Sequence, residues 1–280
     1  MDHISKALEK ATSERESIRD WVKPPNETAK ESTHPSTDLI GELTVVDGEL
    51  LSRNHVLSGP GHEDAVIADK YRLLRTRIMQ LMKPRGWTTL GITSAGPQAG
   101  KTLTAMNLAI TIARSSDQQV VLIDADLRKP SISEDLGLDT RLGLIDYLTS
   151  EVPLPEVLVS LSSIPNLTIL PGRREEASKV TPELLNSHKM RNMVEAFTSK
   201  DPSTLIIVDL PPVLIGDDVL VQASHLQCVL LVVEEDATNA VELQECAELL
   251  SELNLLGTVL NKSQEKARNF EGYYQIGSES

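Results

Sequence analysis

The chain has 280 residues, of which 40% are hydrophobic, and its formal net charge at pH 7 is −14. This length suffices for one large α/β domain with extensions, and the acidity argues against a nucleic-acid partner. The sequence has no run of 18 apolar residues and no apolar segment at its start, so we expect neither a membrane span nor a secretory signal. Cys228 and Cys246 lie far apart in apolar segments, which predicts a reducing compartment, the cytoplasm, and no metal cluster.

Residues 1–60 differ in composition from the rest and are expected to form an N-terminal extension. The first 19 residues carry apolar side chains at helical spacing, which fits either a surface helix or a docking element. Residues 24–35 are rich in Pro, Ser, Thr and charge, which is typical of a linker. Residues 43–46 fit a short strand or a packing segment.

From residue 65 onward, short apolar runs alternate with helical patterns. The expected helices are 65–82, 103–113, 190–197 and 240–253, and the expected strands are 88–93, 120–123, 167–170, 205–208, 228–233 and 256–260. Continuous apolar strands that alternate with helices indicate a mainly parallel sheet covered on both faces, an α/β/α sandwich. Ligands bind such sheets at the carboxyl ends of the strands, where Asp124, Asp126, Asp209 and Asn261 fall.

The segment Ser94–Thr102 lies between an expected strand and an expected helix and ends in Gly-Lys-Thr. This layout is typical of a phosphate-binding P-loop, although GxxxxGK[ST] places glycine where Ala95 stands. In a P-loop, backbone N–H groups surround the phosphates, a lysine such as Lys101 contacts them, and a hydroxyl such as that of Thr102 binds Mg²⁺. The alternative is a chance Gly-Lys-Thr at the start of a helix.

Three aspartates support the P-loop interpretation. Asp124 and Asp126 follow one apolar strand, and Asp209 follows another. An aspartate after a buried strand is the usual Walker B arrangement, in which the carboxylate holds Mg²⁺, often through water. Each aspartate alone could be a turn or cap residue, but together with the loop they predict a nucleotide–Mg²⁺ site.

These motifs resemble the bacterial tyrosine kinases (BY-kinases), within the MinD/ParA class of P-loop proteins. Ser94–Thr102 is similar to their Walker A motif, Leu122–Pro130 to Walker A′, and Val208–Pro212 to Walker B. Thr104–Ala109 resembles the helix after the P-loop, and the opening Ile4–Lys10 resembles the exosortase-linked, XrtA-associated tyrosine autokinases.

The resemblance covers residues 60–262. It implies a P-loop kinase domain over 61–262, followed by a tyrosine-containing tail over 263–280.

The resemblance also implies roles for individual residues. The implied catalytic residues are Lys101, Asp124, Asp126 and Asp209, with Asp124 as the general base or base-positioning acid for a tyrosine hydroxyl. The implied nucleotide contacts are Gly96, Pro97, Gln98, Ala99, Gly100, Lys101, Thr102, Leu103 and Asn261, the last at the adenine. The implied metal ligands are Thr102, Asp124 and Asp209. ATP and Mg²⁺ are therefore the expected substrate and cofactor.

The same resemblance implies assembly and regulation. Asp69, Arg72 and Arg75 match the family's E-x-x-R-x-x-R helix, with Asp for Glu, which joins subunits into rings. Tyr273 and Tyr274 match its C-terminal tyrosine cluster, which neighbouring subunits phosphorylate. The implied partners are further copies of the chain and a transmembrane polysaccharide-export adaptor that activates the kinase at the inner face of the membrane.

Two departures from the family patterns bear on the alternative functions. The family loop usually reads Pro-Gly-Glu-Gly-Lys, so Gln98 replaces a glycine, and a positive φ there would cost about 1 kcal/mol. The MinD/ParA signature lysine would fall at Gly96 and is absent, which argues against a MinD- or ParA-like positioning ATPase. A nucleotide-responsive scaffold with little catalysis is the other alternative, and Gln98 and Ala99 are its main support.

Overall fold

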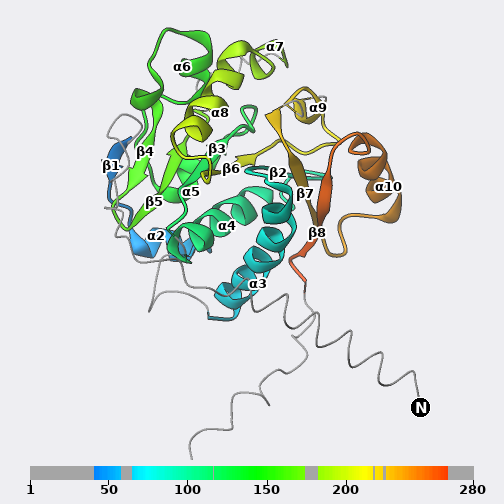
Figure 1. Ribbon diagram of the computed structural model, residues 1–280. Coiled ribbons are helices and arrows are strands. Elements are labelled where there is room, and N and C mark those ends of the chain that lie inside the picture. Colours follow the sequence, from blue (N-terminus) through cyan, green and yellow to red (C-terminus); the bar gives the residue numbers. More distant parts are fainter. Residues whose placement is uncertain are drawn as a thin grey trace, which may run out of the picture. The chain divides into compact units, whose positions relative to one another are not determined.

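The structure, a computed structural model, describes residues 41–57, 65–115, 117–173, 182–216, 218–222 and 225–263. An eight-stranded sheet runs in the order β1-β4-β5-β3-β6-β2-β7-β8 (Figure 1). The strands are β1 (Glu42–Thr44), β2 (Thr89–Ser94), β3 (Val120–Asp124), β4 (Val159–Leu161), β5 (Ile164–Leu170), β6 (Leu205–Asp209), β7 (Cys228–Glu234) and β8 (Leu255–Asn261). Every neighbouring pair is parallel except β4 with β5, so the mainly parallel sheet is confirmed.

Helices cover both faces of this sheet. They are α2 (Gly48–Arg53), α3 (Ala65–Met82), α4 (Lys101–Ser115), α5 (Ile132–Leu136), α6 (Leu144–Thr149), α7 (Pro182–Leu185), α8 (His188–Lys200), α9 (Asp218–Gln222) and α10 (Ala240–Leu249), with short 3₁₀ turns at Lys83–Arg85 and Leu154–Val157. None of the helices in the described ranges combines the length and hydropathy that a bilayer crossing requires.

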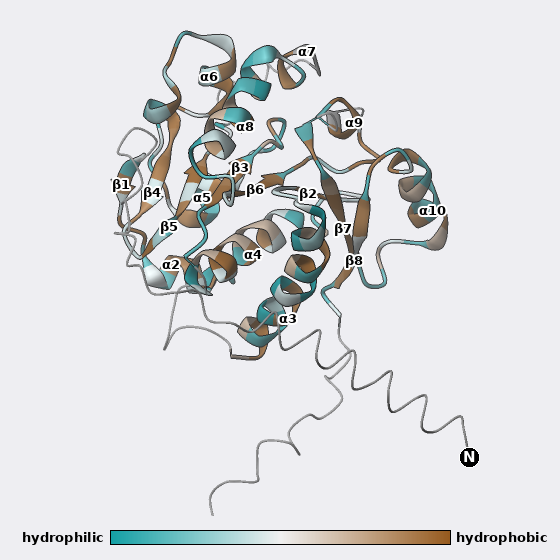
Figure 2. Ribbon diagram, viewed as in Figure 1, coloured by the Kyte–Doolittle hydropathy of each residue, from teal (hydrophilic) through white to brown (hydrophobic). Residues whose placement is uncertain are grey.

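The core is divided between the two faces. Leu122 belongs to one hydrophobic cluster, whereas its neighbours Val121 and Ile123 belong to a second. Because successive side chains of a strand point to opposite faces, the clusters lie on opposite sides of the sheet. Helices α2 to α5 contribute to the first cluster and α6 to α10 to the second, which is the expected sandwich. Figure 2 shows the hydrophobic strands in brown among helices of mixed character.

Residues 41–57 belong to this sheet domain. Strand β1 pairs with β4, and Leu51, Val56 and Leu57 are buried in the first cluster. The folded unit therefore begins upstream of residue 61, where the sequence placed its start. The expected helix near the N-terminus and the tail tyrosines lie outside the described residues.

Strand β4, and the hairpin that joins it to β5, form the main feature that the sequence analysis missed. Only Ser162 and Ser163 separate the two strands, so the connection is a tight hairpin and the pair is antiparallel. The hairpin places β4 between β5 and β1 and so provides the edge against which β1 pairs.

Candidate functional site

The loop from β2 to α4 is shaped by two residues with positive φ, Gln98 at 65° and Gly100 at 91°. Ala95 is buried and does not have a positive φ, so its backbone does not require the glycine of the general motif. The loop ends at Lys101, the first residue of α4. The first N–H groups of a helix lack partners within the helix, which makes this position suited to phosphate oxygens.

Lys101 lies among the carboxylates at the end of the sheet. Its Nζ is 2.7 Å from Oδ2 of Asp126 and 3.4 Å from Oδ1 of Asp209, and its side chain is 8% exposed. Burial alone would lower the pKa of Lys101, but the charges of Asp209 and Asp126 outweigh it and raise the pKa. The ammonium therefore stays charged in a buried position beside the loop.

Thr102 and Asp209 form the second contact of the site. The Thr102 hydroxyl donates to Oδ2 of Asp209 at 2.7 Å. Burial, together with the nearby charge of Asp126, raises the pKa of Asp209 to about 6, although Lys101 and Thr102 act in the opposite direction. A hydroxyl and a carboxylate are thus held side by side at the start of α4.

Asp124 lies next to Asp209 because β3 and β6 pair in register at these two residues. Its side chain is fully buried, and Oδ2 accepts hydrogen bonds from the backbone N–H groups of Ser131 (3.0 Å) and Ile132 (3.1 Å). Its other oxygen, Oδ1, is buried and has no hydrogen-bond partner among the described residues. Burial and the charge of Asp209 raise the pKa of Asp124 well above its ordinary value.

The oxygens here suit Mg²⁺. Thr102, Asp209 and the unpartnered Oδ1 of Asp124 are hard ligands of the kind that Mg²⁺ prefers. Among the described residues, no three His, Cys, Asp or Glu side chains are gathered closely enough to hold a metal by themselves. Magnesium is usually bound through one or two carboxylates, with phosphate and water completing the shell, so the residues fit a nucleotide-associated ion.

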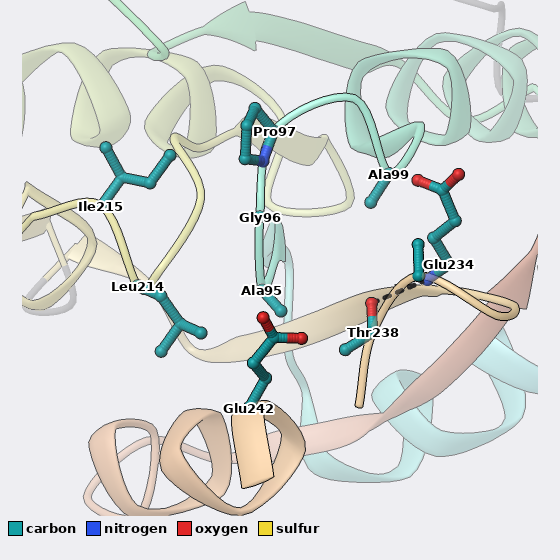
Figure 3. Close-up of a pocket in the computed structure, with 10 residues that line it drawn as sticks. Ala95, Gly96, Pro97, Ala99, Leu214, Ile215, Glu234, Thr238 and Glu242 are labelled. Carbon is teal, nitrogen blue, oxygen red and sulfur yellow. Dashed lines mark hydrogen bonds between the residues drawn. The ribbon is translucent and has the colours of Figure 1, made fainter. Parts of the chain in front are cut away.

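The other expected nucleotide residues are partly brought together. Gly96, Pro97 and Ala99 line a cavity of about 190 Å³ on the α10 side of the loop, with Leu214, Ile215 and Glu242 (Figure 3). None of the lining residues belongs to the group formed by Lys101 and the three aspartates, so this cavity lies beside that group and does not include it. The Leu103 side chain packs against the first hydrophobic cluster, away from that group.

Two contacts at the site were not expected. Gly172 follows β5, and a Cβ on it would lie 3.2 Å from Cγ of Asp124 and 2.6 Å from Cβ of Pro130. Asn261 donates through Nδ2 to the Ala99 carbonyl at 2.8 Å. A Pro-Gly pair after a strand was visible in the sequence, but neither contact follows from spacing along the chain.

The residues expected to mediate assembly lie on α3. Arg72 forms an ion pair with Asp69, and both Arg72 and Arg75 line a cavity of about 210 Å³ with Arg114. Tyr273 and Tyr274 lie outside the described residues.

No family model matches the chain, but several curated proteins do. Tyrosine-protein kinase YwqD of Bacillus subtilis is 30% identical over 210 residues, which cover 74% of this chain and 86% of that protein. Tyrosine-protein kinase ptk of Acinetobacter johnsonii is 28% identical over 76% of this chain, and a putative tyrosine-protein kinase, EpsB of Ralstonia solanacearum, is 30% identical over 80%. The matched segments span 28% and 29% of those two longer proteins.

Solved structures give the same grouping. The kinase domain of the Escherichia coli tyrosine kinase ETK matches with a TM-score of 0.62 and 30% identity, over 72% of this chain and 79% of that domain. The MinD protein of Pyrococcus horikoshii, complexed with Mg-ADP, matches with a TM-score of 0.54 and 22% identity, over 64% of this chain and 72% of its own. The second likeness concerns the fold alone.

Proposed function

Because the chain belongs to the bacterial tyrosine-protein kinase family, we propose that it transfers the γ-phosphoryl group of ATP to tyrosine hydroxyls in a Mg²⁺-dependent reaction. The observation that carries the proposal is the convergence of Lys101, Thr102, Asp124 and Asp209 beside the loop at the carboxyl edge of the sheet.

The residues of the site have different proposed roles in phosphoryl transfer. The loop N–H groups and the Lys101 ammonium hold the phosphates, and Asp126 orients the ammonium at 2.7 Å. Thr102 and Asp209 would supply oxygens for Mg²⁺, and the bound ion would supply positive charge to offset that of the phosphates. Phosphoryl transfer is catalysed mainly by such positioning and charge stabilisation.

Asp124 is the proposed base. A tyrosine phenol has a pKa of about 10, so it must lose its proton as its oxygen attacks the γ-phosphate. The raised pKa of Asp124 makes its carboxylate a stronger proton acceptor than an ordinary aspartate. Its unpartnered Oδ1 is the atom that would accept the proton or hold the metal shell, while Oδ2 is fixed by backbone N–H groups.

We propose the tail tyrosines Tyr273 and Tyr274 as acceptors, phosphorylated by neighbouring copies. We further propose that the kinase acts in the cytoplasm, where a transmembrane adaptor recruits and activates it. The process it serves is the production or export of exopolysaccharide. One relative, from Klebsiella pneumoniae, is named as a putative tyrosine-protein kinase in a cps region, which supports the link to polysaccharide.

Incubation of the purified chain with ATP and Mg²⁺, with and without a candidate adaptor, tests the kinase proposal by phosphotyrosine immunodetection. We expect labelling of the wild type, its loss in Lys101→Met, and loss of most labelling in Tyr273→Phe/Tyr274→Phe. Tyr147→Phe is the matched control, since its hydroxyl contacts the Lys189 carbonyl away from the site, and it should stay labelled. Equal labelling of wild type and Lys101→Met would refute the proposal.

A nucleotide-responsive scaffold is the second candidate, favoured by the positive φ of Gln98 in the loop. It predicts that the wild type binds ATP without forming phosphotyrosine, even with its adaptor. The same experiment therefore separates the two functions.

A further inference from the structure

The end of strand β8 contacts the phosphate-binding loop directly. Nδ2 of Asn261 donates to the Ala99 carbonyl at 2.8 Å, across 162 positions in sequence. A carbonyl oxygen can only accept, so this contact fixes which end of the side-chain amide faces the loop. One of the two N–H donors of the Asn261 side chain is thus already engaged with the loop.

Asn261 is itself held in place. Its carbonyl accepts from the Glu235 N–H at 3.1 Å, and β8 pairs with β7 at Glu234. The side-chain amide therefore projects from a fixed strand end, which is what a supporting contact requires.

The contact with Asn261 supports the peptide group that joins Ala99 to Gly100. A trans peptide is planar, so the Gly100 N–H points away from the Ala99 oxygen and turns with it. Holding that oxygen against Asn261 consequently fixes the direction of the Gly100 N–H. N–H groups at this part of a P-loop are the ones that face phosphate.

Gly100 also shows how closely the two segments approach. A Cβ on Gly100 would lie 2.1 Å from Nδ2 of Asn261, and the backbone there has a φ of 91°. Glycine is thus required both by conformation and by the presence of the asparagine amide.

We propose that Asn261 is a positioning residue for the phosphate-binding loop, acting on the polyphosphate of any nucleotide rather than on the adenine base. The inference rests on the proposed nucleotide site. It differs from the adenine-reading role expected from the family resemblance, and the two roles predict different ligand dependence.

The test measures binding of ATP, GTP and inorganic tripolyphosphate, each with Mg²⁺, by calorimetry to wild type and Asn261→Ala. We expect the dissociation constants of all three ligands to rise by the same factor, about three- to ten-fold, as loss of one hydrogen bond implies. The control is Lys262→Ala, because the Lys262 side chain contacts Glu234 and not the loop. Without ligand, Asn261→Ala should have the same melting temperature as this control. Lys262→Ala should bind all three ligands as the wild type does.

A loss confined to ATP would overturn the proposal in favour of adenine reading, and no loss with any ligand would overturn it as well. A second measurement is a double-mutant cycle with Gly100→Ala, read as the binding free energy of the same ligands. The added methyl group should weaken binding less in the Asn261→Ala background than in the wild type. Strictly additive effects of the two substitutions would contradict the contact. A wild type that binds none of the three ligands would refute the nucleotide site itself. Binding without phosphotyrosine would refute only the kinase.

Discussion

Gln98 holds a backbone conformation that disfavours residues with a Cβ. Its φ is 65°, and its side chain is exposed. We expect Gln98→Gly to raise the free energy of unfolding of the nucleotide-free protein by about 1 kcal/mol, because glycine reaches positive φ without the steric cost. Urea denaturation measures the change.

Gln244→Gly is the control, because Gln244 is an exposed residue inside α10. There the same replacement should lower the free energy of unfolding by about 1 kcal/mol. Equal destabilisation at both positions would mean that the loop at Gln98 carries no such strain.

At the level of residues, the sequence indicated which side chains the structure brings together better than it indicated their contacts. Lys101 and Thr102 were recognisable because the P-loop pattern is local, and Asp124 and Asp209 because each ends an apolar strand. The bond from Asn261 to Ala99 joins segments far apart in the chain, so no local pattern reports it. Hydrogen bonding of Asp124 by Ser131 depends on how the chain turns after β3, which spacing does not fix.

Among the elements, helix α4 connects the loop to residues 55–57 through one buried side chain. Asn107 is fully buried; Oδ1 accepts from the Leu57 N–H at 2.8 Å and Nδ2 donates to the His55 carbonyl at 3.0 Å. Asn107→Ala should lower the free energy of unfolding by about 2–4 kcal/mol, because the buried Leu57 N–H and the part-buried His55 carbonyl lose their partner. Chemical denaturation gives the magnitude, and faster hydrogen exchange of the Leu57 amide gives the location.

Thr111→Val is the matched control on the same helix. Its hydroxyl donates to the Asn107 carbonyl, a bond that a helix does not need. A cost for Thr111→Val as large as that for Asn107→Ala would show that any polar loss in α4 has this effect.

The length of an element decides how well its sequence predicts it. Long apolar strands and the helix Ala65–Met82 were predicted closely, since their periodicity extends over many residues. The three-residue strands β1 and β4 were uncertain or missed, because such short pieces gain their stability from pairing with distant partners. The start of the folded domain was misplaced for the same reason.

For the whole molecule, α3 offers a test of self-association. Arg75→Glu reverses a charge three residues from Arg72, on the helix face expected to join copies of the chain, and we expect the self-dissociation constant to rise by about ten-fold. Sedimentation velocity measures it. Arg77→Glu makes the same charge change at an exposed position two residues on, on another side of the helix, and should leave association unchanged. Equal effects of both variants would indicate a general charge effect rather than an interface.

Strand β8 ends beside the phosphate-binding loop, and this has a consequence for the delivery of the tail. Tyr273 lies ten positions along the chain from Ser263, the last described residue, so the tyrosine can lie at most about 36 Å from that point. An acceptor tyrosine at that position, as proposed, would meet the active site of its own chain at a local concentration on the order of millimolar. Reach alone therefore would not favour a neighbouring copy. The proposed transfer between copies would require an assembly that keeps each acceptor tyrosine away from the active site of its own chain.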